Sequence, residues 1–164
     1  MDKHLLVLHF GSNIGNRIKY LKDALNKTEK AFGKSLATSS IYQTQAWGFS
    51  SQPDFLNMAA IYETSIKPED VLKAIKNIEV ETGRIHREHW HERELDIDII
   101  FYDNQIIEKP DVHIPHPRMH ERNFVLVPLN EICPDYIHPV FKVSVSHLLK
   151  QSTDKLIVEK WNNP

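Results

Sequence analysis

Two aspartates stand two positions apart in an otherwise apolar segment, LDIDIIFY at residues 95–102. The alternation of apolar and acidic residues predicts a β-strand, on which Asp96 and Asp98 project from the same face with their Cα atoms about 7 Å apart. The other face would bury four apolar side chains: Leu95, Ile97, Ile99 and Phe101. Aspartate is disfavoured in strands, so a pair in the middle of one indicates a purpose beyond folding.

Two carboxylates at this separation repel each other unless a cation lies between them. Oxygen ligands suit Mg²⁺, which binds one or two carboxylates together with substrate phosphates. Such a pair can bridge two ions roughly 4 Å apart, the arrangement used for phosphoryl-type transfer. The pattern alone leaves a second interpretation open, in which the two aspartates are unrelated residues on a solvated strand face.

A basic and histidine-rich segment, RIHREHWHER at residues 84–93, comes directly before this strand. Its arginines, Arg84, Arg87 and Arg93, could bind triphosphate oxygens by paired hydrogen bonds, and Trp90 could pack on an adenine ring. The sequence has no Walker A loop, so a nucleotide would have to be held by side chains. Two alternatives stay open: a solvated loop, or a zinc or nickel site built from His86, His89 and His91.

A second basic segment, PHPRMHERNFVLVPL, covers residues 115–129. Pro115 and Pro117 stiffen the backbone around His116. Arg122 precedes an apolar run that begins at Phe124, and a charge held beside a buried segment usually has an anionic partner. Two further basic residues, Arg118 and His120, could join that site or face solvent. A single histidine such as His116 is more often a structural hydrogen-bonding residue than a catalyst.

Length and composition narrow the class of protein. The 164 residues, 41% hydrophobic and 26% charged, fit a single globular domain over residues 1–164. A net charge of −2 argues against a protein that attracts nucleic acid or an anionic membrane through its overall charge. The lone Cys133 allows neither an internal disulfide nor a zinc-cysteine site. No signal peptide or membrane-spanning segment is apparent, so we expect a cytoplasmic protein. No obligate protein partner is evident from the sequence.

Hydrophobic periodicity predicts an α+β fold. The expected elements are a strand at residues 4–10, a helix capped by Ser12 or Asn13 and ending at Gly33, strands at 36–43 and 55–64, a helix from Pro68 to Gly83, and the strand at 95–102. This β-α-β-β-α-β order is that of a ferredoxin-like antiparallel sheet with both helices on one face. A proline-rich C-terminal extension follows, with one or two short helices. Residues 140–164 are expected to form a closing helix and a tail without chemistry.

Several segments together resemble one protein family. They are G-S-N at 11–13, Q-P-D-F-L-N at 52–57, G-R at 83–84, L-D-I-D-I at 95–99 and P-H-P-x-M-x-x-R-x-F-V-L-x-P-L at 115–129. In this order, over about residues 5–139, they resemble the 6-hydroxymethyl-7,8-dihydropterin pyrophosphokinases of folate biosynthesis. The resemblance implies transfer of pyrophosphate from ATP to the pterin hydroxymethyl group, with release of AMP. The substrate hydroxyl would attack the β-phosphorus, so no protein nucleophile is expected.

The resemblance also assigns roles by position. Asp96 and Asp98 would bind two Mg²⁺ ions and, with Arg84 and Arg93, form the catalytic set. The implied ATP site comprises Glu79, Arg84, His86, Trp90, Arg93, Ile99, His116 and Arg122. The implied pterin site comprises Thr44, Trp47, Phe55, Asn57 and Phe124. From the residues alone, core packing would be the preferred interpretation of both phenylalanines.

Three other functions compete with this one. RNA-binding modules share the β-α-β-β-α-β order, but their aromatic sequence signature is missing here and the net charge is negative. A metal-binding module that uses the histidines is a second alternative, and an enzyme of the same type acting on another hydroxymethyl heterocycle is a third.

The segment at residues 84–93 departs from the family, and this generates a prediction. Histidine stands at 86 and 89, where the family commonly has arginine, so the positive charge there depends on pH. We expect the KM for ATP to rise as pH increases through the histidine range near 6.5, because the imidazolium form is lost. Initial rates against ATP concentration at several pH values measure this. A KM that stays flat from about pH 5.5 to about pH 8 would contradict it.

Overall fold

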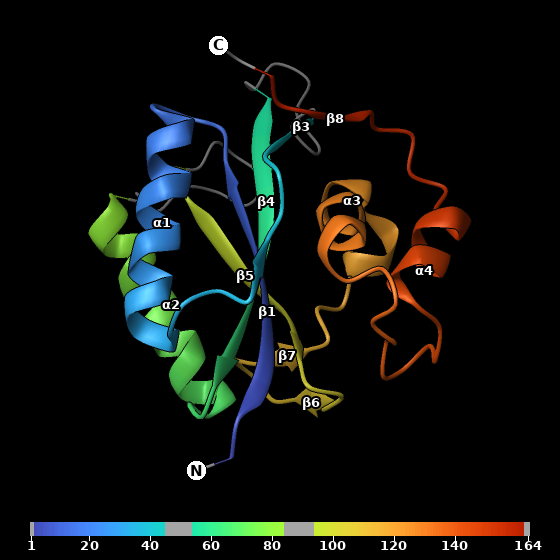
Figure 1. Cartoon of the computed structure of the whole chain (residues 1–164), viewed down its shortest axis with the longest axis horizontal. Coiled ribbons are helices and arrows are strands. Elements are labelled where there is room, and N and C mark those ends of the chain that lie inside the picture. The colour runs from blue at the N-terminus through green and yellow to red at the C-terminus, as the bar shows by residue number, and fades with distance from the viewer. Residues whose placement is uncertain (1, 45–53, 84–93, 163–164) are drawn as a thin grey trace.

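A computed structural model describes residues 2–44, 54–83 and 94–162 of the chain. Within these residues the chain forms an α+β fold (Figure 1). The elements in chain order are β1 (His4–Ser12), α1 (Arg17–Phe32), β2 (Ala37–Thr38), β3 (Tyr42–Thr44), β4 (Phe55–Thr64), α2 (Pro68–Thr82), β5 (Asp96–Tyr102), β6 (Ile107–Glu108), β7 (His113–Ile114), the 3₁₀ helix η1 (Met119–Glu121), α3 (Asn123–Ile132), α4 (Val145–Gln151) and β8 (Val158–Lys160).

The main sheet is antiparallel, with the strand order β5-β1-β4-β3-β8 and with β2 paired to β4. Helices α1 and α2 cover one face of this sheet, and α3 and α4 lie on the other (Figure 1). The strands β6 and β7 form a separate two-stranded ribbon. The sheet is therefore enclosed between two helical layers, and each face has its own hydrophobic core.

The central strand β1 contributes to both cores because its side chains alternate between the two faces. Leu6, Leu8 and Phe10 are fully buried beneath α1 and α2. Val7 is buried on the opposite face, in the core formed with α3 and α4. The nearly continuous apolar run of the sequence is thus explained by a strand covered on both sides.

Strand β5 departs from the strict alternation that the sequence predicts. Its pairing with β1 shifts between Val7, which is opposite Phe101, and Leu8, which is opposite Ile99. Such a bulge places two consecutive residues on one face, here Ile100 and Phe101. The prediction that Phe101 lies on the same face as Leu95, Ile97 and Ile99 is therefore wrong. Phe101 belongs to the core beneath α3, where its ring stacks on Tyr136 with the centroids 4.5 Å apart.

The first helix begins later than expected. Asn16 is its N-cap, and the Asn16 side chain accepts a hydrogen bond from the backbone N–H of Lys19 at 3.1 Å. The prediction that Ser12 or Asn13 caps this helix is wrong, since Ser12 ends β1 and the turn extends to Asn16. The helix ends at Gly33 as predicted.

The second helix has the predicted boundaries. Pro68 is its first residue, and Gly83 ends it in a left-handed conformation with φ of 103°. Glycine adopts this conformation without the steric cost that a Cβ atom would add.

The remaining elements differ in detail from the sequence interpretation. The strand expected at residues 36–43 is divided into β2 and β3. Helix α3 includes Pro128, and the tail contains β8, which pairs with β3. Within the described residues, we find no helix with the length and apolar character needed to cross a bilayer.

Two leucines of β1 that differ in burial provide a test of the core beneath α1 and α2. Leu8 is 0% exposed and Leu5 is 37% exposed. Leu8→Ala is expected to lower the free energy of unfolding by about 3–5 kcal/mol, because it leaves a cavity beneath α1 and α2. Leu5→Ala, the matched control on the same strand, should cost about 1 kcal/mol or less. Urea unfolding measures both, and equal losses for the two variants would contradict the packing described.

Candidate active site

The two aspartates lie on the same face of β5, as the sequence predicts. Asp96 and Asp98 are half-buried, whereas Ile97 and Ile99 between and beyond them are buried on the opposite face. In the pairing with β1, Asp96 is opposite Gly11 and Asp98 is opposite His9. The carboxylates therefore face the α3 side of the sheet, next to the G-S-N segment.

The next strand continues this row of residues. Gly11 is also opposite Asn57 of β4, so one line across the sheet joins Asp96, Gly11 and Asn57. A Cβ atom on Gly11 would lie 3.1 Å from the Asn57 Oδ1 atom and 3.6 Å from the Phe55 ring. The glycine thus lets the Asn57 and Phe55 side chains lie close against β1.

Asn57 carries an unsatisfied hydrogen-bond donor. Its side chain is 1% exposed, and its Nδ2 atom has no hydrogen-bond partner within the described parts of the chain. A buried amide without a partner costs about 1–3 kcal/mol, so native structures usually keep one for a reason. This donor, near the half-buried Phe55, suits recognition of the polar edge of a flat heterocycle. Thr44, opposite Phe55 in the sheet, is also buried.

Helix α3 brings its first turn to the same face of the sheet. The Arg122 guanidinium lies 5.7 Å from the centroid of the half-buried Phe124 ring. The backbone N–H of Asn123 donates to the Asp154 carboxylate at 2.8 Å. An acidic side chain at a helix N-terminus satisfies a free N–H group and interacts favourably with the helix dipole. The C-terminal tail thus holds the segment that carries Arg122 and Phe124.

Burial affects the two basic side chains near the aspartates, Arg122 and His116, differently. Burial lowers the pKa of Arg122, and Arg118 lowers it further, while Asp98 and Asp96 act in the opposite direction. Arginine stays charged despite such a shift. Burial, assisted by Arg122, lowers the pKa of His116 to about 4, although Asp96 opposes the change. At neutral pH the site therefore combines a cationic Arg122 with an uncharged His116.

His116 is connected to β5 through its backbone. Its N–H donates to the Ile100 carbonyl at 3.1 Å, and its Nδ1 atom accepts from the Arg118 N–H at 3.2 Å. The structure thus brings together Asp96, Asp98, His116 and Arg122, which are four of the predicted residues.

His9 also belongs to this cluster, although it is not among the residues that the sequence predicts for the site. It is 3% exposed, faces the α3 side next to Asp98, and has its Nε2 atom 3.1 Å from the Phe124 carbonyl oxygen. Burial lowers the pKa of His9 to about 4, against the opposing effects of the Phe124 carbonyl and Asp96. The available signal was a histidine two residues before Gly11 in an apolar strand, which places both on one face.

Two other predicted residues lie on the opposite side of β5. Glu79 of α2 is buried, and one of its carboxylate oxygens accepts a hydrogen bond from the Ile97 N–H at 2.8 Å. It therefore satisfies a backbone group on an edge strand, between the two aspartates. Ile99 packs in the core beneath α1 and α2. The contacts of Glu79 and Ile99 with ATP stay predictions.

Several predicted site residues lie outside the described residues: Trp47, Arg84, His86, Trp90 and Arg93. The same holds for His89 and His91 of the alternative histidine site. Within residues 2–44, 54–83 and 94–162, no three His, Cys, Asp or Glu side chains form a group that could hold a metal ion. The aspartate pair offers two carboxylates, which is the number that Mg²⁺ uses when substrate phosphates and water complete its shell. The residues present therefore fit that ion.

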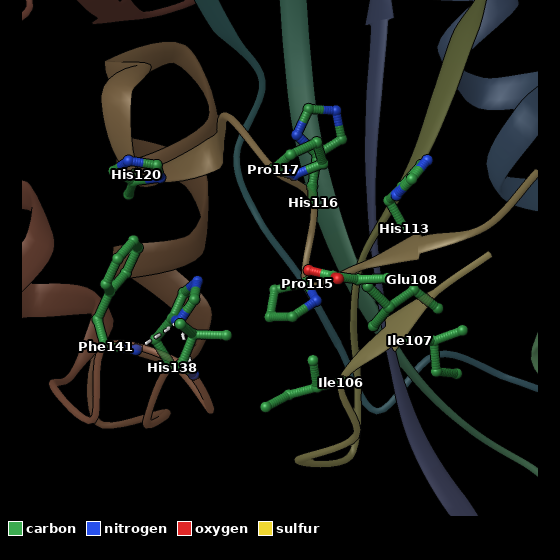
Figure 2. A pocket seen from close by; sticks show the side chains of 12 residues that line it. Ile106, Ile107, Glu108, His113, Pro115, His116, Pro117, His120, His138 and Phe141 are labelled. Atoms are coloured by element: carbon green, nitrogen blue, oxygen red, sulfur yellow. Dashed lines mark hydrogen bonds between the residues drawn. The ribbon is translucent and has the colours of Figure 1, made fainter. Parts of the chain in front are cut away.

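A separate cavity of about 220 Å³ lies beyond His116, between the β6–β7 ribbon and residues 138–141 (Figure 2). His120 lines this cavity, with its ring 4.7 Å from that of Phe141. The sequence leaves open whether His120 joins the aspartate site or faces solvent. The structure shows a third arrangement, in which His120 lines this cavity. His138 is 3% exposed, and its Nδ1 atom accepts hydrogen bonds from the N–H groups of Val140 and Phe141, both at 3.1 Å.

The carboxylate pair and Arg122 on an α+β fold fit the class of enzymes that transfer a phosphorus-containing group. The chain belongs to the 7,8-dihydro-6-hydroxymethylpterin-pyrophosphokinase (HPPK) family, whose family model matches residues 7–134.

Named relatives agree with this assignment. The chain is 38% identical over 148 residues to the 2-amino-4-hydroxy-6-hydroxymethyldihydropteridine pyrophosphokinase of Aquifex aeolicus, covering 90% of this chain and 92% of that protein. It is also 38% identical over 154 residues to the Folic acid synthesis protein fol1 of Pneumocystis carinii, covering 94% of this chain but 21% of that protein.

A solved structure shares the fold. The wild-type HPPK-DHPS of Plasmodium falciparum matches with a TM-score of 0.75 at 18% identity, over 92% of this chain and 45% of that chain. At this identity the likeness shows the fold alone. The chain spans less than half of that two-part protein, so nothing of its second part is carried over.

His138 generates a prediction about stability. Burial, with a smaller effect of His120, lowers its pKa from 6.5 to about 4. On acidification the unfolded chain binds the proton first, so the stability that this histidine contributes is lost as pH falls from about 6.5 towards 4. By about pH 4.5 the loss should be on the order of 2 kcal/mol in the free energy of unfolding.

The variant His138→Asn tests this assignment. Asparagine can offer an acceptor near the position of Nδ1, but it takes up no proton. Urea unfolding of both proteins should therefore show a shallower loss of stability in the variant between about pH 6.5 and about pH 4.5. Parallel curves for variant and wild type would rule out His138 as a source of the pH dependence.

Proposed function

We propose that this chain transfers pyrophosphate from ATP to the hydroxymethyl group of 6-hydroxymethyl-7,8-dihydropterin, releasing AMP, as a step of folate biosynthesis. Membership of the family over residues 7–134 and the likeness to a pyrophosphokinase over 92% of its length support this. The structural observation that carries it is the pair Asp96 and Asp98 on one face of β5, next to Arg122 and to the unsatisfied amide of Asn57.

In this reaction the substrate hydroxyl oxygen forms a bond to the β-phosphorus. The bond from that phosphorus to the oxygen shared with the α-phosphate breaks, AMP leaves with that oxygen, and the hydroxyl proton goes to solvent. Asp96 and Asp98 would hold Mg²⁺, for which we propose two ions. When bound there, Mg²⁺ would offset the charge of the triphosphate and fix its geometry.

The protein then acts by positioning and by charge. Arg122 places a positive charge near both aspartates. The Nδ1 atom of the uncharged His116 accepts from the Arg118 N–H, so its Nε2 atom carries the hydrogen and can donate to a phosphate oxygen without adding charge. We assign the remaining ATP contacts to the residues that the family resemblance implies: Glu79, Arg84, His86, Trp90, Arg93 and Ile99.

For the pterin we propose a site between Phe55 and Phe124. Asn57 donates from Nδ2 to an acceptor on the edge of the heterocycle, and backbone groups of Thr44 and Trp47 complete the edge. Flat rings stack favourably between aromatic side chains, and buried hydrogen bonds select the heterocycle.

The proposal extends to the architecture. The strand order β5-β1-β4-β3, with α1 and α2 on one face, supports a ferredoxin-like topology followed by a C-terminal extension. We propose a single domain over residues 1–164, acting on small molecules. Its cytoplasmic location and its independence from protein partners stay predictions.

Product analysis tests the function. The protein is mixed with MgATP and the reduced pterin alcohol, and AMP is expected as the nucleotide product. ADP in place of AMP would indicate an ordinary kinase, and neither product would favour a binding protein.

Charge removal at the aspartates tests the metal assignment. Asp96→Asn and Asp98→Asn should each lower turnover by on the order of a hundredfold or more, because the variant loses a metal ligand while the strand keeps its shape. Asp135→Asn, at an exposed aspartate, is the control and should leave turnover unchanged. Calorimetry should show that the two site variants lose the Mg²⁺-dependent part of ATP binding. Near-normal turnover in either site variant would remove that residue from the site.

A further inference from the structure

Helix α3 contains a gap in its hydrogen-bond pattern. In an α-helix the N–H of each residue donates to the carbonyl four residues before it. Position 128 within α3 is proline, which has no N–H. The carbonyl of Phe124, four residues earlier, therefore lacks the donor that a regular helix would provide.

His9, from a distant part of the chain, supplies a hydrogen-bond donor to the Phe124 carbonyl. Its Nε2 atom lies 3.1 Å from the Phe124 carbonyl oxygen. A carbonyl oxygen can only accept, so Nε2 carries the hydrogen and donates. His9 is buried on β1, which pairs with β4 on one side and β5 on the other. The donor is therefore held by a strand that is hydrogen-bonded to a neighbour on each side.

The same contact bears on the orientation of the Phe124 ring. The His9 and Phe124 rings are 5.7 Å apart and tilted by 57°, and the Arg122 guanidinium lies 5.7 Å from the Phe124 ring. The neighbouring N–H of Asn123 is bound by Asp154. With its carbonyl fixed by His9, the backbone of Phe124 is restrained from two sides, which limits the directions in which its side chain can project.

We propose that His9 is a positioning residue for Phe124: it supplies the hydrogen bond that Pro128 withholds and so fixes the aromatic wall of the pterin site. The expected consequence of this positioning is tighter binding of the pterin, and it rests on the proposed function. The hydrogen bond itself does not depend on the substrate. Preorganising a binding group raises affinity because the ordering cost is met before the ligand arrives.

Two substitutions at position 9 separate the hydrogen bond from the bulk of the side chain. His9→Met fills a similar volume without a donor, whereas His9→Gln can place an amide N–H near Nε2. We expect His9→Met to raise the pterin Kd about 3- to 10-fold, the effect of one net hydrogen bond. His9→Gln should recover most of the pterin affinity.

Pro128→Ala provides the decisive rescue. Alanine restores the helical N–H that can donate to the Phe124 carbonyl, so the double variant His9→Met/Pro128→Ala should bind the pterin more tightly than His9→Met alone. In the wild-type background, where His9 already serves that carbonyl, Pro128→Ala should change the pterin Kd little. The effect of Pro128→Ala therefore depends on the residue at position 9, and a double-mutant cycle measures that dependence.

Urea unfolding of the same four proteins gives a readout that needs no substrate. The two substitutions should be coupled in stability as they are in binding. Coupling in stability but no pterin binding by the wild type would overturn the proposed function and leave the hydrogen-bond assignment standing. Additive effects in both measurements, or a His9→Met variant that binds the pterin as tightly as wild type, would overturn the positioning role of His9.

Discussion

The hydrogen-bonded register of β1 between β4 and β5 is the constraint on which the site depends. It places Gly11 between Asp96 and Asn57, and it places His9 next to Asp98. Because the side-chain period of a strand is two, a slip of one residue would turn the carboxylates into the core beneath α1 and α2. The fully buried Leu6, Leu8 and Phe10 oppose such a slip, since it would expose them to the polar face. The core and the site are thus fixed by the same pairing.

Helix α3 depends on this strand for its placement. The Val125 and Leu126 side chains pack against the sheet, the tail residue Asp154 binds its first turn, and His9 binds its Phe124 carbonyl. These restraints come from three distant parts of the chain and meet at the segment that carries Arg122 and Phe124. The elements outside the β-α-β-β-α-β unit therefore contribute to the site, and the tail, which was expected to have no role in chemistry, stabilises it indirectly.

Local patterns predicted the local features. Alternation of apolar and acidic residues predicted the common face of Asp96 and Asp98, and apolar spacing with Gly33 and Gly83 predicted where both helices end. The features that were missed depend on residues far apart in the sequence. The bulge in β5 exists only in its pairing with β1, and the contact between His9 and Phe124 joins positions separated by 115 residues. Neither the bulge nor the His9–Phe124 contact can be predicted from the local sequence of the strands or helix involved. The Asn16 cap was missed for a different reason, because Ser12, Asn13 and Asn16 are all good capping residues and only the length of β1 selects among them.

The charge balance of the site follows from burial. Two histidines lie close enough to Asp96 to feel its charge, and exposed imidazoles in that position would become more basic and partly offset it. Here desolvation outweighs the attraction, so His9 and His116 have pKa values of about 4 and carry no charge at neutral pH. The two carboxylates are thus not neutralised by their histidine neighbours, and Arg122 is a cation that interacts with both. In the proposed function, Mg²⁺ supplied with the nucleotide would add the positive charge that lets a site lined by two carboxylates accept a polyanion.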